Sequence, residues 1–90
     1  MNLQEFYDFH KLGRMHFANL CHVDYASLMT YESGREVGEK TRLKIEIGMQ
    51  IIEDYALTFD SPNVFGEDFQ KSQTRKLFEN EFKRITTMEL

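Results

Sequence analysis

The chain has 90 residues, a formal net charge of −4 and a single cysteine. This length is that of one small domain with a limited core, and Cys21 cannot form a disulfide within the chain, so a cytoplasmic location fits better than secretion. The negative charge argues against nonspecific coating of nucleic acid, which needs many Lys and Arg. No basic and apolar leader opens the sequence and no apolar run approaches the roughly 20 residues that span a bilayer, so we expect no membrane association.

Two short helices are predicted at the start of the chain. Asn2 followed by Glu5 has the spacing of a helix N-cap with a reciprocating carboxylate, and apolar side chains then recur at helical intervals. This pattern predicts a helix over residues 3–11. Gly13 interrupts it, and a second helix with one apolar side is predicted over 14–21.

A third helix is predicted between Asp24 and Gly34. Asp24 is a good N-cap because its carboxylate can accept the unpaired backbone N–H groups of the first turn. Gly34 is placed to end the helix, since glycine adopts the left-handed conformation that commonly follows a helix. Leu28 and Tyr31 give this helix an apolar edge.

A fourth helix is predicted over residues 40–56, and its apolar residues form two faces rather than one. A helix with two apolar faces must be covered from both sides. We expect the first three helices to cover the first face and another element to cover the second. The two faces are Leu43, Ile47, Ile51 and Tyr55, and Ile45, Met49, Ile52 and Ala56.

The C-terminal third predicts a turn at 60–63 and a last helix over 67–88. Five of the eight phenylalanines lie beyond residue 56, which is too much aromatic surface for a solvated tail. We therefore expect this helix to pack on the fourth helix of the same or a second subunit and to hold a homodimer. The expected dimerisation residues are Ile45, Met49, Ile52, Phe78, Phe82 and Ile85.

The segment 14–34 carries a pattern of small, apolar and glycine positions. Ala18 is small enough for two helices to cross closely, and Glu32 and Gly34 end the segment. The apolar positions that would hold the helix pair together are Phe17, Cys21, Val23, Leu28 and Tyr31. This segment resembles the helix-turn-helix of the phage repressor and Cro (Xre) family, and the similarity extends to Leu12, Thr41, Leu43 and Ile45.

The resemblance implies an all-α, five-helix, repressor-like fold, with a helix-turn-helix domain over 1–56 and a C-terminal helical extension over 57–90. It also implies a sequence-directed DNA-binding transcriptional regulator that binds a pseudo-palindromic site as a dimer. One departure is His22, which stands in the turn where the family usually has glycine. Because this position often requires a positive φ, we expect the turn to form at a cost of roughly 1 kcal/mol.

The resemblance also implies which residues contact double-stranded DNA. In the family the second helix of the motif lies in the major groove, and the expected base-reading residues are Tyr25, Ala26, Met29 and Thr30. None of them is an Arg, Lys, Asn or Gln that could make two hydrogen bonds to one base, so we expect modest direct readout and a larger contribution from DNA shape. The expected phosphate-contacting residues are Arg14, Arg35, Lys40 and Arg42.

The alternative interpretation is a protein-interaction module, such as an antitoxin or anti-repressor, that keeps the helix-turn-helix fold. The neutral, partly aromatic recognition helix and the overall acidity favour it, whereas the basic loop opposes it. We expect neither catalysis nor a cofactor, because no nucleophile motif or phosphate-binding glycine loop is present. We expect no metal site either, since no ligand pair has suitable spacing among His10, His16, His22 and Cys21.

Overall fold

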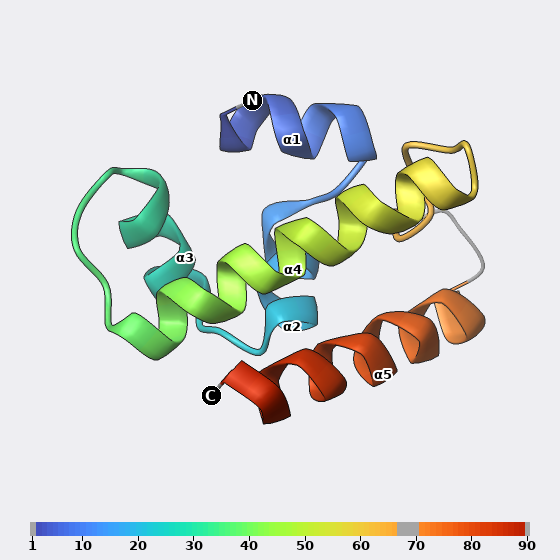
Figure 1. The fold of residues 1–90 in the computed structure, drawn as a ribbon. Coiled ribbons are helices and arrows are strands. Elements are labelled where there is room, and N and C mark those ends of the chain that lie inside the picture. The colour runs from blue at the N-terminus through green and yellow to red at the C-terminus, as the bar shows by residue number, and fades with distance from the viewer. Residues whose placement is uncertain (1, 67–70, 90) are drawn as a thin grey trace.

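The computed structural model describes residues 2–66 and 71–89, and within these ranges every regular element is an α-helix. The predicted all-α fold is confirmed, and the predicted bounds of the first four helices agree with those observed to within two residues. Residues 67–70 of the predicted last helix lie outside the described residues. None of the described helices is long and apolar enough to cross a membrane. The helices are α1 (Leu3–His10), α2 (Arg14–Cys21), α3 (Tyr25–Glu32), α4 (Glu39–Thr58) and α5 (Lys71–Glu89) (Figure 1).

The predicted helix ends are largely confirmed, with one exception. The Asn2 side chain accepts a hydrogen bond from the Glu5 backbone N–H at 2.9 Å, as its N-cap position predicts. Gly34, with φ of +83°, ends α3 as expected. Asp24 does occupy the N-cap position of α3, but its side chain makes no capping hydrogen bond, so that detail of the prediction is wrong.

The tight turn after α2 forms as the sequence predicts. His22 has a φ of 56°, in the left-handed region. The next backbone N–H, that of Val23, donates to the carbonyl of Ala18 at 3.1 Å. The turn is thus closed by backbone hydrogen bonds, which offset the strain of a non-glycine residue with positive φ.

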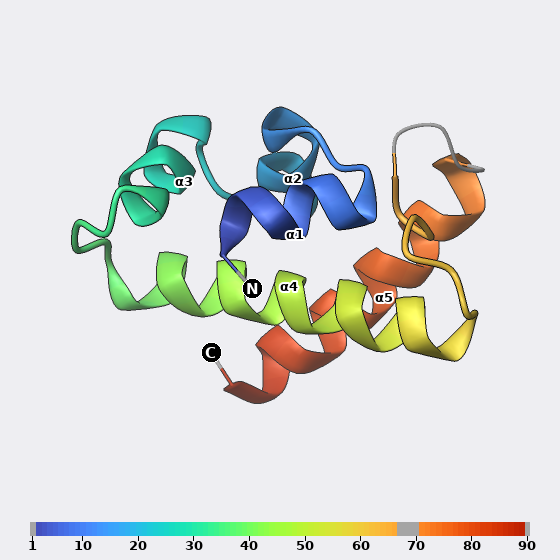
Figure 2. The same cartoon turned by 90° about the horizontal axis from the view of Figure 1, so that it is seen from above.

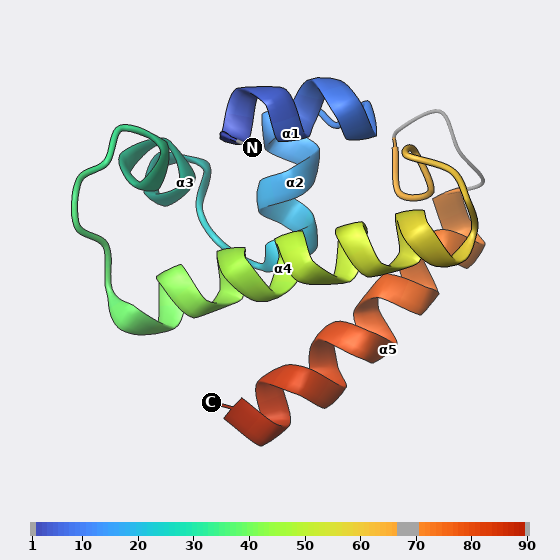
Figure 3. The ribbon, with the colours of Figure 1, turned by 45° about the horizontal axis from the view of Figure 1, so that its top comes forward.

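Helix α4 is the centre of the fold and is covered on two sides. Figure 3 shows α1, α2 and α3 on one side of α4 and α5 on the other, and Figure 2 shows that α5 crosses α4 obliquely. Both layers contribute to one hydrophobic core, which includes Phe6, Phe17 and Leu28 from the first three helices and Phe78 and Phe82 from α5. The prediction that α4 is sandwiched is confirmed.

The prediction of which layer covers which face of α4 is wrong. Leu43, Ile47 and Ile51 line grooves together with Ile85, so this face is turned toward α5. On the other face, Ala56 lines a pocket together with Phe9 and His10 of α1. The periodicity of a helix defines its faces, but it carries no information about which partner covers each one.

The expected contact between α4 and α5 is formed within a single chain. Ile45, Ile52, Phe78 and Phe82 are all buried in the core of one chain, so they are not available as an interface between two folded copies. Met49 and Ile85 are partly buried against the same core. Four of the six expected dimerisation residues are thus buried by a contact between α4 and α5 of the same chain, and the dimer itself stays a prediction.

Two histidine side chains tie the segment after α4 to the first helices. The Nδ1–H of His10 donates to the carbonyl of Pro62, and the Nε2–H of His16 donates to the carbonyl of Phe65 at 2.9 Å. These bonds hold a segment in which Val64 and Phe65 are buried. Among the described residues, no group of three or more His, Cys, Asp or Glu side chains could hold a metal ion.

Gly48 lies where α4 approaches α2 closely. A Cβ atom built on Gly48 would lie 2.3 Å from the Cys21 Sγ, and 3.6 Å from ring atoms of Phe17 and Phe78. The first distance is far below van der Waals contact, so a side chain at this position would force the two helices apart. Cys21 is fully buried and its burial raises the pKa of the thiol, as befits a small packing group.

We expect Phe82→Asp to unfold the chain rather than to dissociate a dimer. The Phe82 ring is 5% exposed and stacks on Phe78, so an unpaired carboxylate there costs about 3 kcal/mol or more. Thermal unfolding followed by circular dichroism at two protein concentrations should show a large loss of Tm that is independent of concentration. Lys83→Asp, which places the same charge on the exposed neighbouring position, is the control. A folded Phe82→Asp monomer obtained from a dimeric wild type would contradict this expectation.

The Gly48 contact predicts that the effect of a substitution at position 48 on stability depends on the residue at position 21. Gly48→Ala gains about 1 kcal/mol of helix propensity, but overpacking against the buried Cys21 sulfur costs about 1 to 3 kcal/mol. We expect a net loss of stability in the wild type and a smaller loss, or a gain, in a Cys21→Ala background, where the sulfur is absent. Urea unfolding of the wild type, the two single variants and the double variant gives the coupling energy between positions 48 and 21. Additive effects would contradict the predicted clash between the new methyl group and the Cys21 sulfur.

Candidate nucleic-acid interface

Helices α2 and α3 form the pair that the sequence predicts as a helix-turn-helix. A three-residue turn separates the two helices, and Figure 3 shows α3 nearly end-on while α2 lies in the plane of the view, so the two helices are strongly inclined. Ala18 of α2 and Leu28 of α3 are both buried, at 1% and 0% exposure. Small and apolar side chains at these positions let the two helices cross closely and fix the orientation of α3.

The outward side of α3 is exposed mainly at its N-terminal turn. Tyr25 is 43% exposed and Ala26 is also exposed, so two of the four expected base-reading residues are accessible to solvent. Thr30 is half-buried, and its hydroxyl donates to the carbonyl of Ala26 at 3.0 Å. Met29 packs partly against the core, which leaves less of its side chain available than the sequence suggests.

The N-termini of α2 and α3 both present backbone N–H groups. Neither helix has a side-chain hydrogen bond at its N-cap, and neither has an acidic residue in its first turn. Unpaired N–H groups and the positive end of the helix dipole favour anions at such positions. The start of α2, which follows Gly13, is therefore chemically suited to phosphate oxygens, whereas the exposed Asp24 carboxylate at the N-cap of α3 opposes an anion there.

A cluster of polar side chains joins the first three helices at the side of this pair. Glu32, at the end of α3, accepts hydrogen bonds from the Tyr7 hydroxyl at 2.9 Å and from the Arg14 Nε at 3.1 Å. The Arg14 guanidinium also donates to the Gln4 side chain and lies 5.0 Å from the centre of the Tyr7 ring. The Glu32 side chain is only 15% exposed, which strengthens these contacts relative to a solvated ion pair. We call Gln4, Tyr7, Arg14 and Glu32 the polar cluster.

The polar cluster changes what Arg14 can do. Its Nε and Nη2 are occupied, and the hydrogen bond to Glu32 raises the pKa of Arg14 further, so the guanidinium stays charged but is largely neutralised. Only Nη1 has no partner among the described residues. The sequence predicted a phosphate contact here and did not anticipate the ion pair with Glu32, because the two residues are 18 positions apart.

The other expected phosphate-contacting residues differ in availability. Arg42 pairs with Glu46 at 3.2 Å, one turn further along α4. Arg35 is exposed, and its side chain contacts only the Ser33 hydroxyl, at 3.3 Å. Lys40 is exposed and forms no ion pair with any described residue. Of the four expected phosphate-contacting residues, Arg35 and Lys40 are thus the two that no ion pair with a described residue occupies, although the exposed Glu36 and Glu39 lie next to them in the chain.

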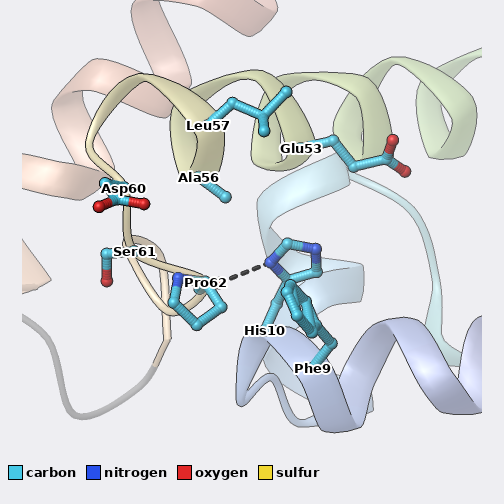
Figure 4. Close-up of a pocket in the computed structure, with 8 residues that line it drawn as sticks. All are labelled: Phe9, His10, Glu53, Ala56, Leu57, Asp60, Ser61 and Pro62. Atoms are coloured by element: carbon cyan, nitrogen blue, oxygen red, sulfur yellow. Dashed lines mark hydrogen bonds between the residues drawn. The ribbon is translucent and has the colours of Figure 1, made fainter.

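One surface feature was not anticipated from the sequence. Phe9, on α1, is 52% exposed and lies beside a pocket at the end of α4 (Figure 4). Phe9 lies outside the buried face of α1, which includes Phe6 and His10. An aromatic residue on the exposed face of a short helix is the sequence feature that could have indicated this surface.

Comparison of the chain with protein-family models, with curated proteins and with solved structures finds no match. Function is therefore inferred from the residues of this chain alone.

The polar cluster predicts a specific loss of stability at alkaline pH. Burial and the hydrogen bond to Glu32 raise the pKa of Tyr7 above its ordinary value of 10. Above pH 10 an unfolded chain ionises this tyrosine while the folded chain keeps it protonated, so the free energy of unfolding falls as pH rises.

The matched variant is Tyr7→Phe, which removes the ionisable hydroxyl and keeps the ring. We expect the wild type to lose about 1.4 kcal/mol per pH unit more than Tyr7→Phe above pH 10. Urea unfolding at pH 8, 10 and 11 measures this difference in slope. Parallel curves for the two proteins would mean that Tyr7 ionises freely in the folded state.

Proposed function

We propose that this chain is a DNA-binding transcriptional regulator of the phage repressor and Cro type, which places α3 in the major groove. The observation that carries the proposal is the α2–turn–α3 unit, in which His22 adopts the left-handed turn conformation and the first turn of α3 faces solvent. In helix-turn-helix proteins this is the part of the second helix that contacts base edges.

The exposed residues of α3 define the sequence readout that such a complex would have. The Tyr25 hydroxyl can donate or accept a single hydrogen bond, and the methyl groups of Ala26 and Thr30 can contact thymine methyls. Because Met29 is partly engaged with the core, its contribution is smaller. We expect a preference for thymine-containing steps and a marked dependence on DNA shape.

The backbone contacts would come from the groups that flank α3. Arg35 and Lys40 lie in and after the loop that follows α3, and both are exposed. The Arg14 Nη1 and the N–H groups at the start of α2 provide a third contact region. These contacts would position α3 without themselves distinguishing sequences.

Binding to a pseudo-palindromic site requires a dimer, and the surface for it must lie outside the shared core. A groove between α4 and α5 is lined by Leu43 and Ile85, and Met88 at its rim is 74% exposed. This groove is one apolar surface that the described part of α5 leaves accessible after the chain has folded. A second copy packed there would supply the two-fold axis that relates two half-sites about 34 Å apart.

The alternative function, a protein-interaction module, is favoured by a different observation. The apolar pocket beside Phe9 lies at the end of α4 remote from α3, so a partner could bind there without covering α3 (Figure 1). DNA binding and protein binding would thus use different surfaces of this chain. Substitutions on one surface can therefore test one function without affecting the other.

The DNA proposal predicts two distinct classes of variant. Arg35→Gln combined with Lys40→Gln should weaken binding to all duplexes equally and should reduce the slope of log K against log salt by about 0.9 for each phosphate that is no longer neutralised. Tyr25→Ala should instead change the ranking of sequences, by about fivefold at the contacted base pair. Fluorescence anisotropy with duplexes selected from a random pool measures both. Lys76→Gln, an exposed cation on α5, is the matched control and should have no effect.

A failure of the wild type to enrich any sequence from the random pool would refute sequence-directed binding. If the double variant and Lys76→Gln weaken binding to the same extent, the contact is nonspecific and does not involve α3.

A further inference from the structure

An open pocket lies between the end of α1, the last turns of α4 and the segment that follows α4. Its volume is about 470 Å³, within the range of ligand-sized sites. Figure 4 shows His10 and Phe9 on one side and Ala56 and Leu57 on the other. In Figures 1 and 3, α3 lies at the opposite end of α4, so the pocket is separate from the proposed DNA surface.

The rim of the pocket exposes large apolar side chains. Leu57 is 82% exposed and Phe9 is 52% exposed. Single exposed apolar residues are common, whereas exposed apolar side chains that border one concave surface are a feature of interaction sites. Because the α4 side of the pocket also contains Ala56, a small side chain, there is room between the two rim residues for an inserted group.

His10 contributes a polar atom to the pocket. The ring is 3% exposed, and its Nδ1–H donates to the carbonyl of Pro62, which can only accept. Nε2 has no hydrogen-bond partner among the described residues, and it is not a fully buried atom. Figure 4 shows it turned away from Pro62, on the side of the pocket where Glu53 lies. In the neutral ring this nitrogen is a fixed hydrogen-bond acceptor.

Two carboxylates complete the rim. Glu53 and Asp60 both line the pocket, both are exposed, and neither forms an ion pair with a described residue. Two unpaired negative charges beside an apolar surface favour a cationic partner. A second copy docked about a two-fold axis would bring like charges together at this rim, which disfavours self-association through it.

We propose that this pocket docks a basic amphipathic segment of a partner protein. An aromatic side chain with an N–H or O–H donor enters between Phe9 and Leu57 and donates to the His10 Nε2. Lys or Arg side chains of the same segment then lie beside Glu53 and Asp60. A buried aromatic anchor surrounded by charge pairs is the usual arrangement of a strong contact in a protein interface.

The choice of a protein segment over a small molecule follows from the shape of the pocket. Leu57 projects almost wholly into solvent, and it could be covered only by a surface that extends beyond the pocket itself. A helix or an extended peptide provides such a surface, whereas a small ligand in the pocket would leave most of Leu57 exposed.

The test begins with a phage-displayed library of random 12-residue peptides selected on the full chain. We expect the enriched peptides to share an aromatic residue, Trp above all, flanked by Lys or Arg. Titration of a synthetic peptide of the enriched sequence should shift the backbone amide resonances of residues 9–10 and 53–57. Enrichment of peptides without an aromatic and basic pattern, or resonance shifts elsewhere, would overturn the proposal.

Variants then assign the contacts. Leu57→Asp should weaken peptide binding by about tenfold or more without unfolding the chain, because Leu57 is exposed. Glu53→Lys should also weaken binding, and a peptide with its basic residue changed to Glu should recover part of the loss. Leu77→Asp, which changes an exposed leucine on α5, is the matched control and should bind normally.

Three further outcomes would replace the proposal with another occupant or site. If Leu57→Asp binds the peptide as well as the wild type does, the peptide binds elsewhere. If sedimentation shows a wild-type dimer that Leu57→Asp abolishes, the surface is an interface between copies. If indole alone perturbs the same resonances at concentrations as low as the peptide, the site takes a small molecule. None of these measurements involves DNA, so they are independent of the function proposed for α3.

Discussion

The fold depends on the close approach of α4 to α2 at Gly48. The absence of a side chain there lets the buried Cys21 sulfur reach the α4 backbone, and it also leaves room for the ring of Phe78 from α5. One position on α4 thus serves both layers. Because a glycine inside a helix is unfavourable by about 1 kcal/mol relative to alanine, its presence in the middle of a 20-residue helix is explained by this packing rather than by local preference.

The polar cluster fixes the orientation of α3 by a second, electrostatic route. Glu32 at the end of α3 is bonded to Tyr7 of α1 and Arg14 of α2, so the three helices are joined near the proposed DNA surface. The same bonds reduce the positive charge that Arg14 offers to a phosphate. Stability and binding therefore compete for one guanidinium, and the phosphate contacts of the proposed complex depend more on Arg35 and Lys40.

Local features were predictable from the sequence and long-range ones were not. The helix starts and ends, the left-handed turn at His22 and the end of α3 at Gly34 follow from residues adjacent in the chain. The predicted faces of α4 exist, but they were assigned to the wrong layers, because periodicity does not identify the covering element. The pairing of Arg14 with Glu32 and the pocket beside Phe9 depend on tertiary contacts that no local pattern encodes.

The net charge of −4 suggests that the chain avoids DNA, but the distribution of charge in space weakens this objection. The unpaired carboxylates of Glu53 and Asp60 lie at the end of α4 remote from α3. A helix of 20 residues is about 30 Å long, several times the Debye length of about 8 Å at physiological ionic strength. Charges at the pocket would therefore be screened from a duplex at α3, where the exposed Arg35 and Lys40 lie beside the exposed Glu36 and Glu39. The same separation would leave the acidic pocket facing away from the DNA, accessible to a basic partner while α3 is bound.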